Sequence, residues 1–213
     1  MSPVRIVIIA KAPIPGFCKT RLIPALGATG AAELAHRMLN VAVNAALASD
    51  VGPVELCVSP GLDEYDWSAL DLPGGLTWSG QGIGDLGARM ARAAQRATSD
   101  GAPVVLMGTD CPSLDSGMLR RASAALLDHD ASLIPAEDGG YTLLGLQRFD
   151  ETLFEHMPWS TPGVAAETRR RIARLGWRLC ELPPLHDIDE PQDLPRLPAA
   201  MRAELPAHLR STP

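Results

Sequence analysis

The sequence lacks any excess of positive charge, and it contains very little lysine. Its formal net charge is -6 at pH 7, which leaves no field to attract a polyanion such as DNA, RNA or an anionic membrane surface. We therefore expect neither a nucleic acid nor a membrane as a partner. Of the nineteen basic residues only Lys11 and Lys19 are lysine, and both lie in one short stretch near the N-terminus.

Long apolar runs and paired cysteines are also missing. No apolar run approaches the roughly eighteen residues that span a bilayer, and the run at 6–10 is too short for the core of a signal peptide. We therefore expect the chain to stay in the cytoplasm. Cys18, Cys57, Cys111 and Cys180 form no C-x-x-C pair. Neither a zinc site nor a disulfide framework is indicated, and reduced thiols are expected.

What is present is the composition of a folded protein. The chain has 213 residues, of which 46% are hydrophobic and 21% are charged, and this composition excludes a disordered or fibrous chain. Apolar runs typical of strands alternate with apolar residues at helical spacing. The predicted strands cover 4–10, 54–59, 76–79, 104–108, 131–136, 141–146 and 177–181. The predicted helices cover 29–49 with Thr29 as N-cap, 86–100, a segment capped by Asp115, and 164–175.

This alternation predicts the fold class. Strand-helix-strand units imply right-handed crossovers and a mainly parallel sheet, so the predicted class is α/β, with a three-layer, Rossmann-like arrangement. The strands at 131–136 and 141–146 flank a turn sequence and are predicted to form a hairpin, an antiparallel portion toward the C-terminus. We find no internal repeat and no long polar linker, and we expect a single domain over 1–213.

The loop after the first strand is the most informative segment. Residues 11–26 read KAPIPGFCKTRLIPAL, at the sheet edge where ligands bind in such folds. Gly16 lets backbone N–H groups approach a phosphate chain, Lys19 offers a mobile point charge, and Arg21 offers a planar fork for two oxygens. The alternative is that these are solvated loop charges, because the segment matches neither G-x-x-x-x-G-K-[ST] nor G-x-G-x-x-G.

Acidic residues follow the fourth strand and recur near the end of the chain. Asp110 lies in GTDCP, beside the first loop if the first and fourth strands are neighbours, and a carboxylate there suits Mg²⁺ together with phosphate oxygens and water. Asp187 and Asp189 are two apart in HDIDEP and point to the same side if that segment is extended, so one of them could complete the metal site. A turn before Pro112 and a helix N-cap explain the same residues without a metal.

Two later segments carry polar groups that could face a second substrate. Residues 137–141 read EDGGY, whose carboxylates could face an acceptor, although a hairpin connection explains them equally. Residues 159–163 read WSTPG, whose hydroxyls could contact phosphate, although entry into a helix explains these as well.

Taken together and in this order, six segments resemble one family. They read KAPIPGFCKTRL, QGIGDLGARM, GTDCPSL, PAEDGGYTLLGL, WSTPGV and HDIDEPQDL, and the similarity spans roughly residues 4 to 194. They resemble the bacterial family of radical-SAM/selenodomain-associated transferases type 1. That family looks like part of the nucleotide-diphospho-sugar transferase superfamily, which has the glycosyltransferase-A fold and also holds molybdenum-cofactor guanylyltransferase and 2-phospho-lactate guanylyltransferase.

The resemblance implies that different parts of the chain bind the nucleotide and the acceptor. It implies a nucleotide-binding part over about 1–130, an acceptor part over about 131–195 and a tail at 196–213. The implied nucleotide-binding residues are Ala10, Lys11, Gly16, Lys19, Thr20, Arg21, Gly82 and Thr109, and Lys19, Arg21 and Asp110 are the implied catalytic residues. Asp110 and Asp189 would hold Mg²⁺, with Mn²⁺ also possible. The acceptor would meet Asp138, Gly139, Gly140, Tyr141, Ser160 and Thr161.

Two transferase reactions are compatible with this resemblance. In nucleotidyl transfer, a small phosphorylated acceptor attacks the α-phosphate of a nucleoside triphosphate, and pyrophosphate leaves. In glycosyl transfer, a metal at a D-x-D motif after the fourth strand holds a nucleotide-sugar donor. Only Asp110 is present there, between Thr109 and Cys111, which favours nucleotidyl transfer. A nucleotide-binding module without catalysis is the alternative from a different class.

Overall fold

The computed structural model describes residues 3–205, so the predicted tail lies outside the described residues from position 206 onward. Within that range seven strands form one sheet, in the order β3-β2-β1-β4-β6-β5-β7. The strands are β1 (Arg5–Lys11), β2 (Val54–Ser59), β3 (Leu76–Gly80), β4 (Val104–Met107), β5 (Ala131–Pro135), β6 (Tyr141–Leu146) and β7 (Leu179–Glu181). The helices are α1 (Ile23–Ser49), α2 (Leu86–Ala97), α3 (Ser116–Ala125), α4 (Val164–Arg174) and α5 (Ala199–Ala203).

The sheet confirms the predicted α/β class. Strand β1 pairs in parallel with both β2 and β4, and β3 extends the sheet in parallel beyond β2. Strand β6 runs antiparallel to β4 and β5, whereas β7 is parallel to β5. The hairpin of β5 and β6 is therefore the predicted antiparallel portion. The neighbouring positions of β1 and β4 also bring together the two loops that carry the predicted cations and Asp110.

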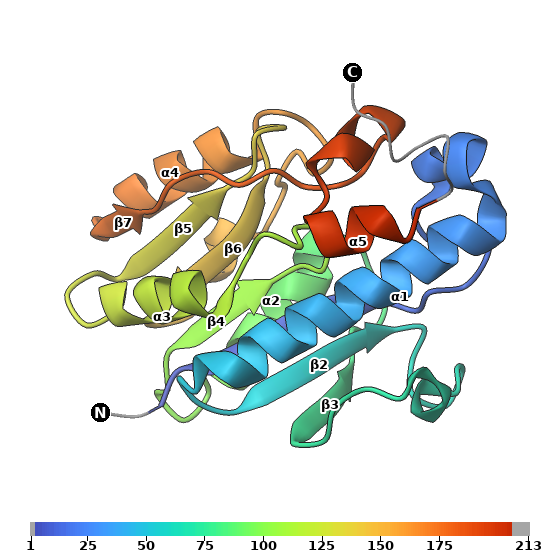
Figure 1. Cartoon of the computed structure of the whole chain (residues 1–213). Coiled ribbons are helices and arrows are strands. Elements are labelled where there is room, and N and C mark those ends of the chain that lie inside the picture. Colours follow the sequence, from blue (N-terminus) through green and yellow to red (C-terminus); the bar gives the residue numbers. More distant parts are fainter. Residues whose placement is uncertain (1–2, 206–213) are drawn as a thin grey trace.

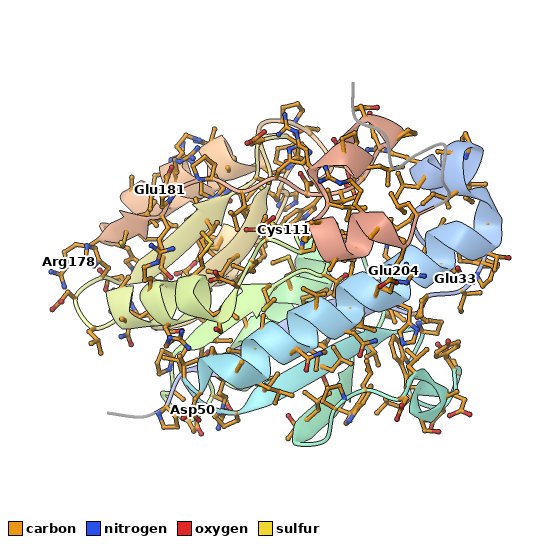
Figure 2. The ribbon with its side chains drawn as sticks, viewed as in Figure 1. Glu33, Asp50, Cys111, Arg178, Glu181 and Glu204 are labelled. Atoms are coloured by element: carbon orange, nitrogen blue, oxygen red, sulfur yellow. The ribbon has the colours of Figure 1, made fainter. Side chains whose placement is uncertain are left out.

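Helices cover both faces of the sheet (Figure 1). In β1, Ile6 and Ile8 are buried in the same apolar cluster as residues of α1 and α3. Val7, which points to the opposite face, is buried with residues of α2 and α4. The continuous β-branched run of β1 is thus explained by burial on both faces. Helix α5 lies on α1 (Figure 1). Glu204 follows α5 directly and lies over α1 (Figure 2). Its carboxylate pairs with Arg37 of α1 at 2.8 Å.

Helix α1 begins earlier than predicted, and its predicted cap is wrong. It begins at Ile23, with Pro24 in the first turn, where the missing N–H of proline costs nothing. Gly27 has non-helical angles (φ 71°), so the helix is kinked there. The regular apolar spacing starts only after this kink, which is why that spacing predicts Thr29 as the N-cap. Thr29 instead lies inside the helix.

Two further boundaries show how local hydrogen bonds decide where elements end. Helix α3 has the predicted cap, since the Asp115 side chain accepts a hydrogen bond from the N–H of Met118. Strand β7 begins at Leu179 rather than 177 because the Trp177 N–H donates back to the Ile172 carbonyl at the end of α4. No helix among residues 3–205 has the length and apolar character needed to cross a membrane.

Candidate functional site

A cleft of about 900 Å³ opens at the carboxyl ends of β1 and β4. Strands β1 and β4 are neighbours in the sheet, with β2 on the other side of β1 and β6 on the other side of β4. The strand order therefore reverses between β1 and β4. Parallel α/β sheets bind their ligands at such a reversal. The loops after β1 and β4 line the cleft, together with the start of α2, the turn between β5 and β6 and the segment before α4.

Lys19 lies between two carboxylates in this cleft. Its ammonium Nζ is 2.6 Å from Asp110 Oδ1 and 2.7 Å from Asp189 Oδ1, and the side chain is only 8% exposed. The ammonium also donates a hydrogen bond of 2.6 Å to the Ile188 carbonyl. Burial by itself lowers the pKa of Lys19, but the two carboxylates outweigh burial and raise the pKa above the ordinary lysine value. Lys19 is therefore charged at neutral pH.

Local backbone geometry places these groups together. Lys19 has a left-handed backbone conformation (φ 45°) and precedes a single 3-10 turn over Thr20–Leu22. The Leu22 side chain is fully buried and anchors that turn. On the other side, the Ile188 N–H donates a 2.8 Å hydrogen bond to the Asp110 carbonyl. The loop after β1, the loop after β4 and the segment before the tail therefore meet at one point.

The other predicted nucleotide-binding residues divide into two groups. Lys11, Thr20, Arg21 and Thr109 line the cleft with Lys19. The Arg21 side chain is 66% exposed, and its guanidinium nitrogen Nη1 lies 3.6 Å from Glu190 Oε1. It is free to turn toward a ligand, since an exposed ion pair of this length is weak.

Ala10, Gly16 and Gly82 are not among the described residues that line the cleft. Ala10 is 1% exposed, and its carbonyl accepts a hydrogen bond from the Gln81 side chain. Gly16 and Gly82 have positive φ angles of 84° and 71°, which glycine adopts without strain. These three residues are therefore not placed to contact a ligand in the cleft through a side chain.

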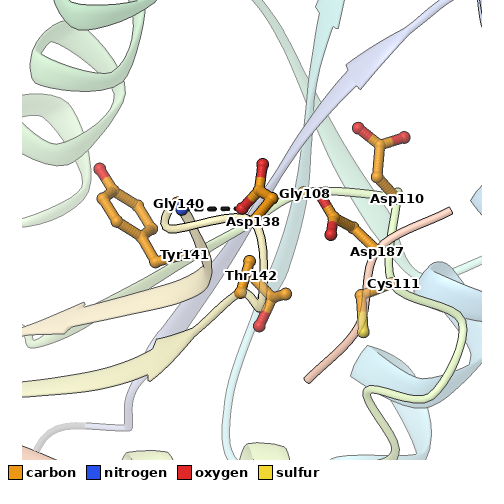
Figure 3. A pocket seen from close by; sticks show the side chains of 9 residues that line it. Gly108, Asp110, Cys111, Asp138, Gly140, Tyr141, Thr142 and Asp187 are labelled. Atoms are coloured by element: carbon orange, nitrogen blue, oxygen red, sulfur yellow. Dashed lines mark hydrogen bonds between the residues drawn. The ribbon is translucent and has the colours of Figure 1, made fainter. Parts of the chain in front are cut away.

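A smaller cavity of about 120 Å³ adjoins Asp110. Figure 3 shows the carboxylates of Asp110, Asp138 and Asp187 around it, contributed by three different segments. Burial, and then the neighbouring charge of Asp138 and the other aspartates, raises the pKa of Asp187 to about 6. Both predicted carboxylates of the HDIDEP segment thus face the site, Asp187 toward the small cavity and Asp189 toward Lys19.

These side chains suit a divalent cation only when another ligand is present. Carboxylate oxygens are the hard donors that Mg²⁺ and Mn²⁺ prefer, and Asp110 and Asp189 lie close together because they share one ammonium. Among the described residues, however, no group of three or more His, Cys, Asp or Glu side chains is arranged to hold a metal. The donor set therefore fits a cation that brings phosphate oxygens and water with it.

Most of the predicted acceptor residues line the large cleft. They are Asp138, Gly140, Tyr141, Ser160 and Thr161. Gly139 instead faces the segment before α4, since a Cβ atom on it would lie 2.1 Å from the Pro162 carbonyl oxygen. Its own carbonyl accepts a 2.8 Å hydrogen bond from the Ala165 N–H. The two predicted acceptor segments are thus packed against each other, and Gly139 is required for that contact.

The predicted list omitted several residues of the cleft wall. Gln81 is 3% exposed, lines the cleft, and donates from its amide to the carbonyls of Ala10 (2.8 Å) and Cys57 (3.1 Å). Arg89 also lines the cleft and donates to the Gly84 carbonyl at 2.9 Å. Arg92 is not among the described residues that line the cleft, but it donates to the carbonyls of Gln81 and Ile83 in the loop after β3. Gln81 and Arg89 belong to the QGIGDLGARM segment at 81–90, so this segment is the sequence feature that points to them.

The cysteines near the site are not paired. Cys18 lines the large cleft and Cys111 the small cavity, and all four cysteines are free thiols. Burial raises the pKa of Cys111 to about 11 and also raises the pKa of Cys18. Both thiols are therefore protonated at neutral pH, in agreement with the expected reduced state and with a packing role.

Sequence and structure comparisons identify relatives. The profile of the family described as "Uncharacterized protein conserved in bacteria (DUF2064)" matches residues 33–161. No protein in the curated collection matches the sequence. A protein from Desulfovibrio desulfuricans G20, provisionally described as a nucleotide-diphospho-sugar transferase, is 32% identical over 92% of this chain and 87% of that chain, with a TM-score of 0.84.

More distant structures share the fold. A cytidylyltransferase from Leptospira borgpetersenii is 15% identical, and the alignment covers 100% of this chain and 91% of that chain with a TM-score of 0.61. Rv0371c from Mycobacterium tuberculosis, in complex with manganese, is 17% identical over 88% and 92% of the two chains, with a TM-score of 0.50. Sequence identities this low show a common fold and nothing further.

Proposed function

The chain belongs to the DUF2064 family, and from that premise and the cleft geometry we propose that it is a nucleotidyltransferase. It would join a nucleoside triphosphate to a small phosphorylated acceptor and release pyrophosphate. The 32% identical relative, with its provisional description, supports a nucleotide-utilising transferase. The cytidylyltransferase shares only the fold at 15% identity, so it shows that this architecture is compatible with nucleotidyl transfer. The finer assignment to the radical-SAM/selenodomain-associated type 1 family stays a prediction.

One observation carries the choice of reaction. A single carboxylate after β4, Asp110, shares the Lys19 ammonium with Asp189, which is far away in the sequence. Two carboxylates from separate segments around one cation position fit the binding of a triphosphate with its metal. A D-x-D pair on one loop, as expected for a nucleotide-sugar donor, would need a carboxylate at 108 or 112, where the chain has Gly108 and Pro112.

The proposed reaction forms one bond and breaks one bond at the α-phosphorus. An acceptor oxygen bonds to the α-phosphorus while the bond from that phosphorus to the oxygen bridging the α- and β-phosphates breaks, so pyrophosphate leaves with the electron pair. Arg21 would meet two phosphate oxygens with its planar fork, and Lys19 would add a point charge near the leaving group. Backbone N–H groups of the loop near Gly16 and Thr20 would complete the phosphate contacts.

A divalent cation and the acceptor complete the proposed site. When bound at Asp110 and Asp189, Mg²⁺ or Mn²⁺ would neutralise phosphate oxygens and help to align them. Asp138, Gly140, Tyr141, Ser160 and Thr161 would position the acceptor, because they line the cleft beyond Asp110. Nucleotide-binding and acceptor parts at about 1–130 and 131–195 remain our proposed division of the chain.

Glycosyl transfer from a nucleotide-sugar is the second candidate function. The description of the 32% identical relative favours it directly. The two candidates differ in what they release, since nucleotidyl transfer yields pyrophosphate and glycosyl transfer yields a nucleoside diphosphate.

The test follows both products with one enzyme preparation. Each nucleoside triphosphate with Mg²⁺ and a panel of phosphorylated acids and sugars is assayed for pyrophosphate, and nucleotide-sugars with the same panel are assayed for nucleoside diphosphate. We expect metal-dependent pyrophosphate release that Asp110→Asn strongly reduces. Nucleoside diphosphate without pyrophosphate would establish glycosyl transfer instead. Nucleotide binding with neither product across the panel would indicate a binding module.

A further inference from the structure

Lys19 occupies the place that a metal would need between Asp110 and Asp189. We propose that the Lys19 ammonium and the divalent cation compete for these two carboxylates. Metal then enters the site only together with a nucleotide, whose phosphates become the new partner of Lys19. The exchange with the nucleotide rests on the proposed nucleotidyl transfer, whereas the competition itself concerns the protein without any nucleotide.

The contacts of Lys19 are those of a built-in cation. An ammonium has three N–H donors, and Lys19 has three oxygen partners: Asp110 and Asp189 at 2.6 and 2.7 Å and the Ile188 carbonyl at 2.6 Å. With a side chain that is 8% exposed, it is held in place and shielded from water. The same oxygen, Oδ1, of each aspartate makes the contact.

A metal ion cannot share this position with the ammonium. Mg²⁺ binds carboxylate oxygens at about 2.0–2.1 Å, which is shorter than either distance from Nζ to Oδ1. A cation that reached both Oδ1 atoms would therefore lie in or against the volume of the ammonium. Two positive charges at such separation repel each other strongly in a partly buried site. Binding of a metal through these two oxygen atoms therefore requires Lys19 to move.

The protein alone offers too little to displace Lys19. Within residues 3–205 no cluster of three or more acidic, His or Cys side chains is arranged for a metal, so these residues do not supply a full set of ligands by themselves. A nucleotide changes this balance in two ways. Its phosphate oxygens add ligands for the metal, and they also give the displaced ammonium a new anionic partner.

The surroundings of Lys19 allow such a change of partner. The residue lines the large cleft as well as contacting the carboxylates, so the flexible four-carbon stem can carry Nζ toward the cleft without movement of the backbone. The backbone itself is fixed by the turn of Thr20–Leu22 and by buried Leu22. Only the end of the side chain has to move.

Titration of the nucleotide-free protein with Mn²⁺, followed by electron paramagnetic resonance of the free ion, tests the competition. We expect Lys19→Met to bind Mn²⁺ about tenfold more tightly than the parent, because a charge next to both carboxylates is removed. Lys11→Met is the matched control. It removes the same charge from the same cleft, but Lys11 has no contact with Asp110 or Asp189, and its Mn²⁺ affinity should stay close to that of the parent. Equal affinity of Lys19→Met and the parent would overturn the proposal, as would an equal gain in both variants.

A second measurement uses the parent chain and covers the case in which Lys19→Met does not fold. Since the sequence has only two lysines, labelling with ¹³Cε-lysine gives two NMR signals, and Lys11→Met assigns them. We expect Mg²⁺ alone to leave the Lys19 signal in place and Mg²⁺ with a nucleoside triphosphate to shift it. A shift with Mg²⁺ alone, or no shift when calorimetry shows that the nucleotide is bound, would overturn the proposal. Neither the Mn²⁺ titration nor the NMR shift depends on turnover. If the proposed nucleotidyl transfer fails, this is seen separately, because no pyrophosphate is released.

Discussion

The two sides of the cleft are built by different interactions. On the side of β1, β2 and α2, Gln81 and the arginines 89 and 92 hold the loop after β3 through hydrogen bonds to backbone carbonyls. On the side of β4 and β6, the carboxylates of Asp110, Asp138 and Asp187 gather around a small cavity. On the first side the hydrogen-bonding groups have partners within the protein. On the second side the negative charges of the carboxylates outnumber the positive charges that contact them.

This difference indicates which side of the cleft gains more from binding a ligand. Hydrogen-bonded carbonyls gain little from further partners, so the first side provides a rigid wall. Buried carboxylates close to one another are unfavourable: burial first, and then the charges of the neighbouring aspartates, raise the pKa of Asp187, and such a group gains from any added cation. Lys19 links the two sides, because it comes from the loop after β1 and neutralises carboxylates that follow β4 and precede the tail.

The largest expected effect comes from the acidic side. Asp110→Asn removes one of the two carboxylates proposed to hold the metal, and pyrophosphate release should fall by about 10² to 10³-fold, as for the loss of a preorganised charged group. Steady-state assays with the best triphosphate and acceptor measure this effect. Asp63→Asn, which changes an exposed carboxylate outside the cleft, should retain parental rates. Parental turnover in Asp110→Asn would remove the acidic side from the reaction.

The cationic loop gives the next largest effect. Arg21→Lys keeps the positive charge but replaces a fork with a point charge, so kcat should fall by about tenfold or more. Arg37→Lys is the control, since Arg37 pairs with Glu204 on the surface of α1, and its kcat should equal that of the parent. If Arg21→Lys loses no more activity than Arg37→Lys, Arg21 does not form a two-oxygen contact with phosphate.

The rigid wall is tested by stability rather than by rate. Gln81→Ala leaves the buried carbonyls of Ala10 and Cys57 without their side-chain partner, and the free energy of unfolding should decrease by about 2 kcal/mol. Urea unfolding at neutral pH measures the change. Gln95→Ala on the exposed face of α2 should stay within about 0.5 kcal/mol of the parent. Equal stability of the two variants would mean that Gln81 does not support the wall.

The smallest expected effect depends on pH. The pKa of Asp187 is about 6 in the fold against an ordinary aspartate value of 3.8, so between these values the folded chain keeps a proton that the unfolded chain has lost. The parent therefore loses stability as the pH rises from about 4 to about 6. Asp187→Asn avoids this loss and should be more stable by about 1 kcal/mol at pH 7, after allowance for solvent screening, with no gain at pH 4. Urea unfolding of both proteins at pH 4 and pH 7 measures the difference. Equal free energies of unfolding at pH 7 would refute the prediction.

The sequence predicts the architecture better than the contacts inside the site. Buried β-branched runs such as the one in β1 place most strands correctly, because burial on both faces leaves no other arrangement for them. The cap at Asp115 is equally local and is correct. The start of α1 is missed because a kink at Gly27 separates its first turn from the periodic part.

Contacts across long stretches of sequence could not be predicted in this way. The bond from Lys19 to Asp189 joins residues 170 positions apart, and no pattern in either segment specifies the other. Gln81 is part of a segment noted for its similarity, but its two carbonyl partners become visible only when β1 and β2 are in register. The sequence therefore predicts which segments form the cleft, but it does not predict which residues of these segments contact each other.

We propose above that this cleft binds a nucleoside triphosphate together with a divalent cation. Thermal unfolding with each triphosphate and each nucleotide-sugar, with and without Mg²⁺, tests it most directly, because a ligand that binds only the folded state stabilises it. At a ligand concentration of about 100 times Kd, the stabilisation of about 2.7 kcal/mol corresponds to a rise in Tm of roughly 5–10 °C for a chain of this length. We predict such a rise for at least one triphosphate, larger with Mg²⁺ than without it. A rise with nucleotide-sugars alone, or no rise with any of these ligands, would contradict this proposal.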